Sequence, residues 1–131
     1  MTKTALIVED EIFVALDLER ILTDAGYTVC AIAADQEEAL AAAGGCGFAF
    51  IDVNLRDGPS GPAIARAIAR EHGIKVVFVT ANPAQIADAP ALAFVRKPFS
   101  ERAIRAAAAL AAGERPVPSA DGLTLCAAKG G

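Results

Sequence analysis

Five short apolar runs recur along this chain, and each has the length of a β-strand. They are ALIV at 5–8, TVCAIA at 28–33, FAFI at 48–51, VVFV at 76–79 and LAFV at 92–95. Branched and aromatic side chains are frequent in these runs, as is typical of strands. The segments between them carry helix signals, so strands and helices alternate. That order predicts a mostly parallel sheet with right-handed crossovers and with helices on both faces.

The segments between the runs show helix starts and stops. Apolar residues recur at helical spacings after the first run, and Gly26 then ends that pattern. Asp35 followed by Glu38 forms the pattern of an N-cap with its capping box, and Ser100 also suits an N-cap. The expected helices cover residues 11–25, 36–44, 62–72 and 101–112.

One interval is too short to follow this rhythm. Residues 81–91 separate the fourth and fifth runs and include Pro83 and Pro90, so a helix there has room for little more than a turn or two. The expected fold is therefore α/β, a doubly wound five-stranded parallel sheet with a shortened or irregular fourth helix. It should occupy residues 1–113. Residues 114–131 shift to proline, glycine and small side chains, and we expect them to form a flexible C-terminal tail.

Charge and hydropathy argue against two classes of partner. Sixteen acidic and twelve basic residues give a net charge of −4. Nucleic acids and anionic membranes favour a basic face, so we expect neither as a partner. The longest apolar runs are too short to span a bilayer, and the N-terminus does not have the layout of a signal peptide. A cytoplasmic location is expected.

The chain has three cysteines, Cys30, Cys46 and Cys126, and no CxxC arrangement. An odd number without metal-ligand spacing indicates neither a disulfide framework nor a zinc site. We expect Cys30 and Cys46 to be reduced and to act as small buried hydrophobic residues.

Polar residues follow the apolar runs where the carboxyl ends of parallel strands would gather. Glu9 and Asp10 follow the first run, Asp52 the third, Thr80 the fourth, and Lys97 comes just after the fifth. Taken singly, Asp10 can be a helix cap, Thr80 a strand residue and Lys97 a solvated charge. Three carboxylates near one point repel one another unless a cation lies among them, and Mg²⁺ prefers oxygen ligands. Lys97 and Thr80 then suit a phosphoryl group.

The segments LIVEDE, FIDVNLRDGPSG, VVFVTA and FVRKPF, in this order and spacing, resemble the response-regulator receiver domain of two-component signalling. The resemblance covers residues 3 to 113 and implies a flavodoxin-like fold. It implies that Asp52 is the phosphoacceptor, which receives a phosphoryl group from a histidine kinase or a histidine phosphotransfer protein. It also implies a Mg²⁺ site formed by Glu9, Asp10, Asp52 and the backbone carbonyl of Asn54.

The same resemblance implies roles for residues near the end of the domain. Thr80 matches the switch hydroxyl, Lys97 the phosphoryl-binding lysine and Phe94 the switch aromatic residue, although Phe94 can equally be a permanently buried ring. The bond between Lys97 and Pro98 is expected to be cis, as in the family. The protein is then a stand-alone regulator that accepts a phosphoryl group and binds a downstream protein target, and it is not an enzyme that turns over an external substrate.

Two other functions fit parts of the pattern. A small phosphatase of the haloacid dehalogenase type also uses an aspartate after a parallel strand, Mg²⁺ and a lysine, but it has a second aspartate where this chain has Asn54. A receiver-like module that binds partners without phosphorylation is the third possibility, although Asp52, Lys97 and the acidic pair are all present. Labelling of Asp52 by a phosphodonor distinguishes these functions.

Overall fold

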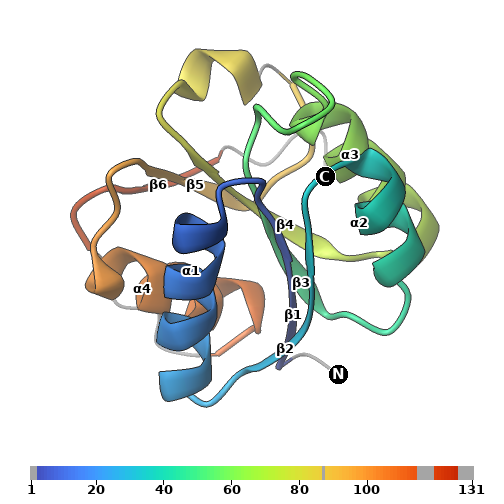
Figure 1. Cartoon of the computed structure of the whole chain (residues 1–131). Coiled ribbons are helices and arrows are strands. Elements are labelled where there is room, and N and C mark those ends of the chain that lie inside the picture. The colour runs from blue at the N-terminus through green and yellow to red at the C-terminus, as the bar shows by residue number, and fades with distance from the viewer. Residues whose placement is uncertain (1–2, 87, 115–119, 127–131) are drawn as a thin grey trace.

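A computed structural model of the chain describes residues 3–86, 88–114 and 120–126. Strands and helices alternate along the chain, as the sequence predicts (Figure 1). Within these residues no helix is long and apolar enough to cross a membrane. In chain order the elements are β1 (Thr4–Val8), α1 (Ile12–Asp24), β2 (Thr28–Ala33), α2 (Gln36–Ala42), β3 (Phe48–Ile51), α3 (Gly61–His72), β4 (Lys75–Thr80), the 3₁₀ helix η1 (Pro83–Ile86), β5 (Ala93–Arg96), α4 (Glu101–Ala111) and β6 (Leu123–Leu125).

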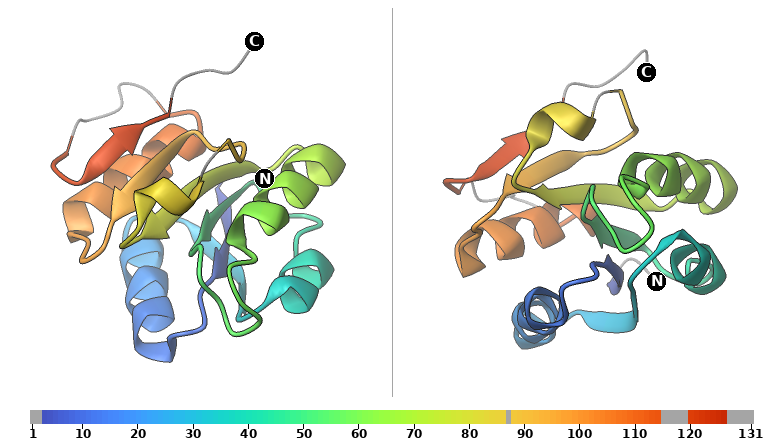
Figure 2. Two further views of the ribbon diagram at one scale, coloured as in Figure 1. Left: turned by 90° about the horizontal axis from the view of Figure 1, so that it is seen from above. Right: turned by 45° about the horizontal axis from the view of Figure 1, so that its top comes forward.

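The strands form one sheet in the order β2-β1-β3-β4-β5-β6. The pairs from β2 to β5 are parallel, and β6 is antiparallel to β5. Helices α1 and α4 cover one face of the sheet and α2 and α3 cover the other (Figures 1 and 2). The prediction of a doubly wound α/β sheet is therefore confirmed, except that the sheet has six strands and not five.

Two apolar cores hold these layers together. On one face Leu18 and Leu22 of α1 and Ile104 of α4 pack against the sheet, and on the other Ile64 and Ile68 of α3 do so. Every residue of the central strand β3 is buried because it is covered on both sides. Each large side chain removed from water in this way contributes roughly 1.5–3 kcal/mol. The central strands are therefore a rigid support for whatever follows their carboxyl ends.

The expected helix caps at Asp35 and Ser100 are present. The Asp35 carboxylate accepts a hydrogen bond from the Glu38 N–H group at 2.9 Å, and the Ser100 hydroxyl accepts one from Ala103 N–H at 3.1 Å. Each cap satisfies a donor that the first turn of a helix leaves without a partner. The positions at which α2 and α4 begin are thus encoded locally in the sequence.

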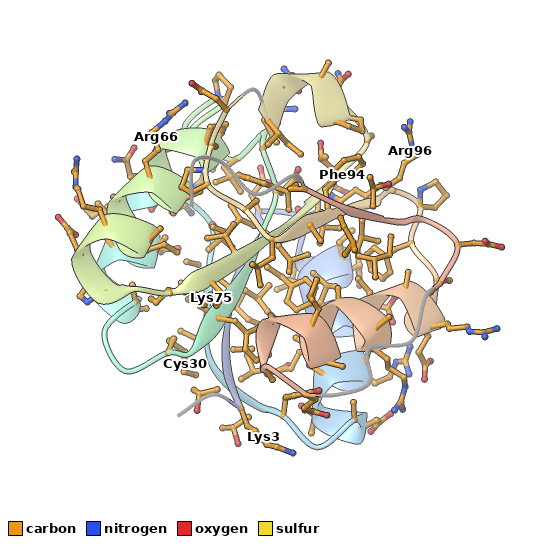
Figure 3. The ribbon with its side chains drawn as sticks, turned by 180° about the vertical axis from the view of Figure 1, so that it is seen from behind. Lys3, Cys30, Arg66, Lys75, Phe94 and Arg96 are labelled. Carbon is orange, nitrogen blue, oxygen red and sulfur yellow. A yellow bond between two sulfur atoms is a disulfide. The ribbon has the colours of Figure 1, made fainter. Side chains whose placement is uncertain are left out.

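The two cysteines expected to be reduced are joined in the structure. A disulfide links Cys30 on β2 to Cys46, which precedes β3, with the two Cα atoms 6.6 Å apart (Figure 3). The pairing of β1 with β2 shifts between Ala5 and Leu6, which leaves Cys30 as the extra residue of a β-bulge. Cys30 therefore leaves the regular alternation of the strand, and its sulfur is bonded to that of Cys46, which belongs to the buried core. The expectation of free thiols was therefore wrong. The residue types alone do not reveal a bulge of this kind.

The sixth strand comes from the segment that we expected to be a flexible tail. Leu123 pairs with Val95 and Leu125 with Ala93, so that β6 lies along the outer side of β5. Flanking hydrogen bonds run from Arg96 N–H to the Gly122 carbonyl at 3.1 Å and from Cys126 N–H to Leu92 at 2.8 Å. The expectation therefore does not hold for residues 120–126, because β5 offers unpaired backbone groups to a short segment with strand propensity. The rest of the predicted tail beyond Glu114, residues 115–119 and 127–131, lies outside the described residues.

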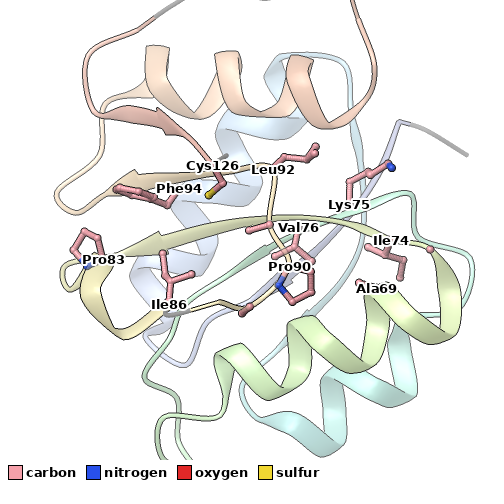
Figure 4. A pocket seen from close by; sticks show the side chains of 13 residues that line it. Ala69, Ile74, Lys75, Val76, Pro83, Ile86, Pro90, Leu92, Phe94 and Cys126 are labelled. Carbon is pink, nitrogen blue, oxygen red and sulfur yellow. The ribbon is translucent and has the colours of Figure 1, made fainter. Parts of the chain in front are cut away.

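In the described part of the short interval before β5, the one helical element is the 3₁₀ helix η1, in keeping with the expected shortened or irregular fourth helix. Ile86 of η1 is buried, but this single turn covers little of the β4–β5 face. A largely apolar cavity of about 590 Å³ remains between α3, η1 and β5. Figure 4 shows Phe94 and Cys126 on one side of this cavity and Ile86 and Pro90 on the other.

Reduction of the Cys30–Cys46 disulfide should lower the free energy of unfolding by about 3 kcal/mol, the loop-closure contribution expected for a ring of this size. Urea unfolding followed by far-UV circular dichroism, with and without dithiothreitol, measures the change. The Cys30→Ser variant should match the reduced wild type, and Cys126→Ser, which alters the free thiol, should match the oxidised wild type. Identical urea midpoints for oxidised and reduced wild type would contradict a stabilising disulfide.

Candidate functional site

The candidate site lies at the carboxyl ends of β1 and β3, where two buried carboxylates meet. The Glu9 N–H group donates to the Ala33 carbonyl at 2.8 Å, and Asp52 N–H donates to the Val8 carbonyl at 2.9 Å. These bonds extend the sheet by one residue, so both acidic residues are held by the strands and not by a loop. Glu9 is only 2% and Asp52 only 7% exposed. Carboxylate oxygens of Glu9, Asp10 and Asp52 all lie within 4.8 Å of one another.

A lysine ammonium group bridges the two buried carboxylates. Lys97 Nζ donates to Glu9 Oε1 at 2.8 Å and to Asp52 Oδ2 at 2.9 Å. The backbone N–H of Lys97 donates to the Thr80 carbonyl at 3.0 Å, which anchors this residue to the end of β4. The Lys97–Pro98 peptide bond is cis. Lys97 therefore reaches from the end of β5 to the carboxylates of Glu9 and Asp52 at the ends of β1 and β3.

Burial dominates the electrostatics of the site. The pKa of Glu9 is raised to about 7: burial is the largest cause, the hydrogen bond from Lys97 offsets part of its effect, and the neighbouring charge of Asp52 adds to it. Burial alone would lower the pKa of Lys97, but its hydrogen bonds to Glu9 and Asp52 outweigh burial and raise the pKa. Lys97 is thus a permanent cation, whereas Glu9 changes charge near neutral pH.

Asp10 adds an exposed carboxylate to the cluster. The N-cap of α1 is Glu11, and no side-chain hydrogen bond caps this helix, so Asp10 is not the helix cap that one interpretation of the sequence allowed. Three carboxylates from two strand ends form a donor set made only of oxygen, the kind that a hard divalent cation prefers. The residues present therefore fit Mg²⁺.

Thr80 lies at the end of β4 and is 1% exposed. Its hydroxyl oxygen accepts a hydrogen bond from Asn82 N–H at 2.9 Å, which leaves the hydroxyl hydrogen as a donor. Asn54 lies two residues after Asp52, and its side-chain amide donates to Gln85 Oε1 at 2.9 Å. That hydrogen bond connects the loop after the buried aspartate directly to η1.

Phe94 is half-buried and lies on the rim of the β4–β5 cavity. Phe94 pairs with Phe78 of β4, and Thr80 lies two residues further along β4. Because side chains alternate between the two faces of a sheet, Phe94 and Thr80 are on the same face, one pleat apart. The ring is therefore not the permanently buried core residue that one interpretation allowed. The adjacent cavity offers space for a different rotamer.

Two features of the site were missed in the sequence. A Cβ atom on Gly61 would lie 2.3 Å from the Asp52 carbonyl oxygen, so only glycine lets α3 begin this close to the end of β3. Ile12, Phe13 and Leu16 of α1 are exposed, although apolar residues at helical spacings are expected to face the core. Apolar residues on more than one face of α1 were the available signal for an exposed patch.

A doubly wound sheet with a lysine-bridged acidic cluster at the carboxyl ends of its strands is the arrangement of a receiver domain. A family model described as the response regulator receiver domain matches residues 5–109. The chain therefore belongs to this family, whose members act in two-component signalling.

Proteins called PhyR are prominent among the relatives. The phyllosphere-induced regulator PhyR of Methylorubrum extorquens is 32% identical over 105 residues, which cover 76% of this chain and 39% of that protein. The chain thus spans less than two fifths of that curated relative. The solution structure of the PhyR receiver domain of Erythrobacter litoralis has a TM-score of 0.79 and 29% identity, over 90% of this chain and 95% of that one. A CheY-like receiver domain of Methanospirillum hungatei has a TM-score of 0.67 and 28% identity, over 76% of this chain and 85% of that one.

The contribution of Glu9 to the free energy of unfolding should decrease as the pH rises from 4.5 to about 7. Folding raises the pKa of Glu9, so this contribution is fully present below the unfolded value of 4.5 and is lost as the pH passes about 7. A shift of this size corresponds to roughly 3 kcal/mol. Urea unfolding in EDTA at pH 5 and pH 8 measures it as the difference between wild type and Glu9→Gln. If wild type and variant change in parallel with pH, the pKa of Glu9 is not raised.

Proposed function

We propose that this chain is a phosphoacceptor response regulator of a two-component or phosphorelay pathway. In this proposal Asp52 is phosphorylated in the presence of Mg²⁺ by a histidine kinase or a histidine phosphotransfer protein, and the aspartyl phosphate changes a protein-binding surface. The observation that carries the proposal is the Asp52 carboxylate, which lies next to two other acidic groups and is hydrogen-bonded to Lys97 Nζ at 2.9 Å. The chain would act as a regulator and not as a turnover enzyme.

The chemistry asks little of the protein beyond position and charge. An Asp52 oxygen attacks the phosphorus of a phosphohistidine, a P–O bond forms, and the P–N bond to the imidazole breaks in line with it. Glu9, Asp10, Asp52 and the Asn54 carbonyl would hold Mg²⁺, which would supply positive charge for the transferring oxygens. Lys97 already lies beside Asp52, and its raised pKa keeps it charged for the same purpose.

The proposed switch uses Thr80 and Phe94, which lie one pleat apart on the same face of the sheet. A phosphoryl oxygen on Asp52 offers the Thr80 hydroxyl hydrogen a new acceptor. Movement of Thr80 toward it vacates space on the face that Phe94 shares, and the ring can turn away from the cavity rim into that space. The surface that changes then includes the β4–β5 cavity and η1.

The exposed patch on α1 supports a kinase or phosphotransfer partner. Ile12 is 57%, Phe13 85% and Leu16 46% exposed. Phe13 also lines a cavity of about 500 Å³ together with Lys97 and Pro98, so the patch adjoins the phosphoacceptor edge. A partner that brings a phosphohistidine to Asp52 can bury these apolar side chains as it docks.

A downstream protein target is the proposed output. Among the similar solved structures is one titled anti-anti-sigma factor PhyR from Bartonella quintana, with 26% identity and a TM-score of 0.69 over 83% of this chain and 46% of that one. An anti-anti-sigma factor regulates through other proteins. By analogy we propose a protein target for this chain.

The Asp52→Asn substitution should abolish labelling by acetyl phosphate or another small phosphodonor. Wild type should gain the mass of a single phosphoryl group only when Mg²⁺ is present, because the carboxylate is the nucleophile and the metal neutralises the incoming charge. Intact-mass spectrometry is the direct readout because the chain has no tryptophan for a quenching assay.

The same experiment separates the rival functions. Steady release of phosphate from a phosphomonoester that depends on Asp52 would favour a phosphatase of the haloacid dehalogenase type. Absence of any adduct on wild type, with Mg²⁺ binding shown by a rise in the thermal midpoint, would favour a receiver-like module that binds partners without phosphorylation. Labelling of Asp52→Asn at the wild-type rate would refute Asp52 as the phosphoacceptor.

The Phe13→Ala substitution should slow phosphotransfer from a histidine kinase about tenfold relative to labelling by acetyl phosphate, since exposed aromatic residues at an interface commonly contribute 1 kcal/mol or more. The ratio of the two rates separates docking from chemistry. Leu125→Ala is the matched control, because Leu125 is a similarly exposed apolar residue (64%) on β6. An unchanged ratio for Phe13→Ala, or an equal loss for Leu125→Ala, would argue against docking on α1.

A further inference from the structure

The Cys30–Cys46 disulfide closes a covalent ring over residues 30–46. The two cysteines are 16 positions apart, and the chain between them contains the end of β2, the whole of α2 and the loop before β3. The ring therefore joins the edge of the sheet to the helix that packs beside it. Neither the proposed phosphotransfer nor the proposed switch uses this segment.

The first turn of α2 holds the loop that follows Asp52. The Arg56 guanidinium pairs with the carboxylates of Asp35 and Glu38, the latter at 3.4 Å. On the neighbouring residue, the Asp57 carboxylate accepts a hydrogen bond from Gln36 N–H at 3.1 Å. The backbone of the same loop is attached as well, because Arg56 N–H donates to the Ala34 carbonyl at 3.3 Å.

These contacts connect the disulfide to the phosphoacceptor loop, residues 54–58. The loop is closed on itself by hydrogen bonds between Leu55 and Gly58 at 2.8 and 3.0 Å. The contacts just described attach it to residues 34–38, which lie inside the ring. Hydrogen bonds and ion pairs thus link the phosphoacceptor loop directly to the segment that the disulfide closes into a ring.

The two cysteine residues differ in exposure in a way that suits reversible chemistry. Cys30 is exposed, whereas Cys46 is only 8% exposed. An external thiol can therefore attack the sulfur of Cys30, with Cys46 as the leaving group. Cys46 Sγ lies 3.3 Å from the Ala42 carbonyl oxygen, so the thiol formed on reduction has a hydrogen-bond acceptor in place.

We propose that Cys30 and Cys46 are a reversible redox site that controls how firmly the phosphoacceptor loop is held. Oxidation proceeds by exchange with a low-molecular-weight disulfide such as oxidised glutathione. The Cys30 thiolate attacks it and releases one thiol, and the Cys46 thiolate then attacks the mixed disulfide at Cys30 and releases the second. The pair loses two electrons and two protons, which leave as the hydrogens of two small thiols, and a dithiol reverses the reaction.

Opening the ring restores conformational freedom to residues 31–45, and segments with fewer constraints open locally more often. The bonds from Asp35, Gln36 and Glu38 to the loop then form on a less rigid support. The loop begins at Asn54, only two residues after Asp52. A loop that is held less firmly should therefore slow phosphorylation of Asp52. This last consequence rests on the proposed function.

Hydrogen exchange tests the proposal without any phosphorylation. Exchange should accelerate roughly fivefold to tenfold in peptides covering 34–42 and 54–58 when wild type is reduced, since both depend on the ring. The Cys30→Ser variant should reproduce this result, and Cys126→Ser should not. Arg56→Ala in the oxidised protein should accelerate exchange at 54–58 but leave 40–46 unchanged, which would identify the route of coupling. Unchanged exchange at 54–58 on reduction would overturn the proposal.

Reversibility is tested by intact mass in glutathione buffers. The mass should rise by two hydrogens on reduction and return on addition of oxidised glutathione, and failure of the disulfide to re-form in the folded protein would overturn a reversible site. Acetyl phosphate should label reduced wild type severalfold more slowly than oxidised wild type, and equal rates would overturn the link to the phosphoacceptor. Absence of labelling in both states would contradict the proposed function alone, because the exchange measurement stands independently.

Discussion

The structure depends on one ammonium group placed between two carboxylates that the fold removes from water. Glu9 and Asp52 are buried because they are attached to the ends of two strands inside the sheet, and charges in that position are costly unless they are paired. Lys97 provides the pairing from the far side of the sheet. Strand order, the anchoring of Lys97 to Thr80 and the course of the chain around Pro98 all serve to bring that one nitrogen to those oxygens. The same arrangement offers carboxylate oxygens that fit a divalent cation, and an ammonium group beside them that carries positive charge.

Much of this arrangement was predictable because it follows from local patterns. Apolar runs that end on an acidic residue identify Glu9 and Asp52, and the caps at Asp35 and Ser100 are encoded within four residues of sequence. What could not be predicted depends on pairing between distant segments. The disulfide of Cys30 follows from a register shift against β1. Likewise, β6 exists because β5 provides unpaired backbone groups, and a three-residue strand is too short for any periodicity to reveal.

The short fourth helix changes the relation between the site and its surroundings. A longer helix would cover the β4–β5 face, whereas η1 leaves a cavity there and places Gln85 where it can bind the Asn54 side chain. The loop after Asp52 is therefore held from two sides, by η1 through Asn54 and by α2 through Arg56. The end of β3 at Asp52 is thereby connected both to the cavity and to the ring closed by the cysteines.

The way in which the sheet ends affects how the protein behaves in concentrated solution. Open strand edges promote edge-to-edge association, and proteins protect them with short strands and bulges. One edge of this sheet is β6, which covers β5 with only three residues, and the other is β2, where the extra residue Cys30 interrupts the regular ladder. Neither edge offers a long, regular template to a second copy of the chain. Both terminal strands therefore disfavour edge-to-edge association between copies of the chain and favour a monodisperse solution.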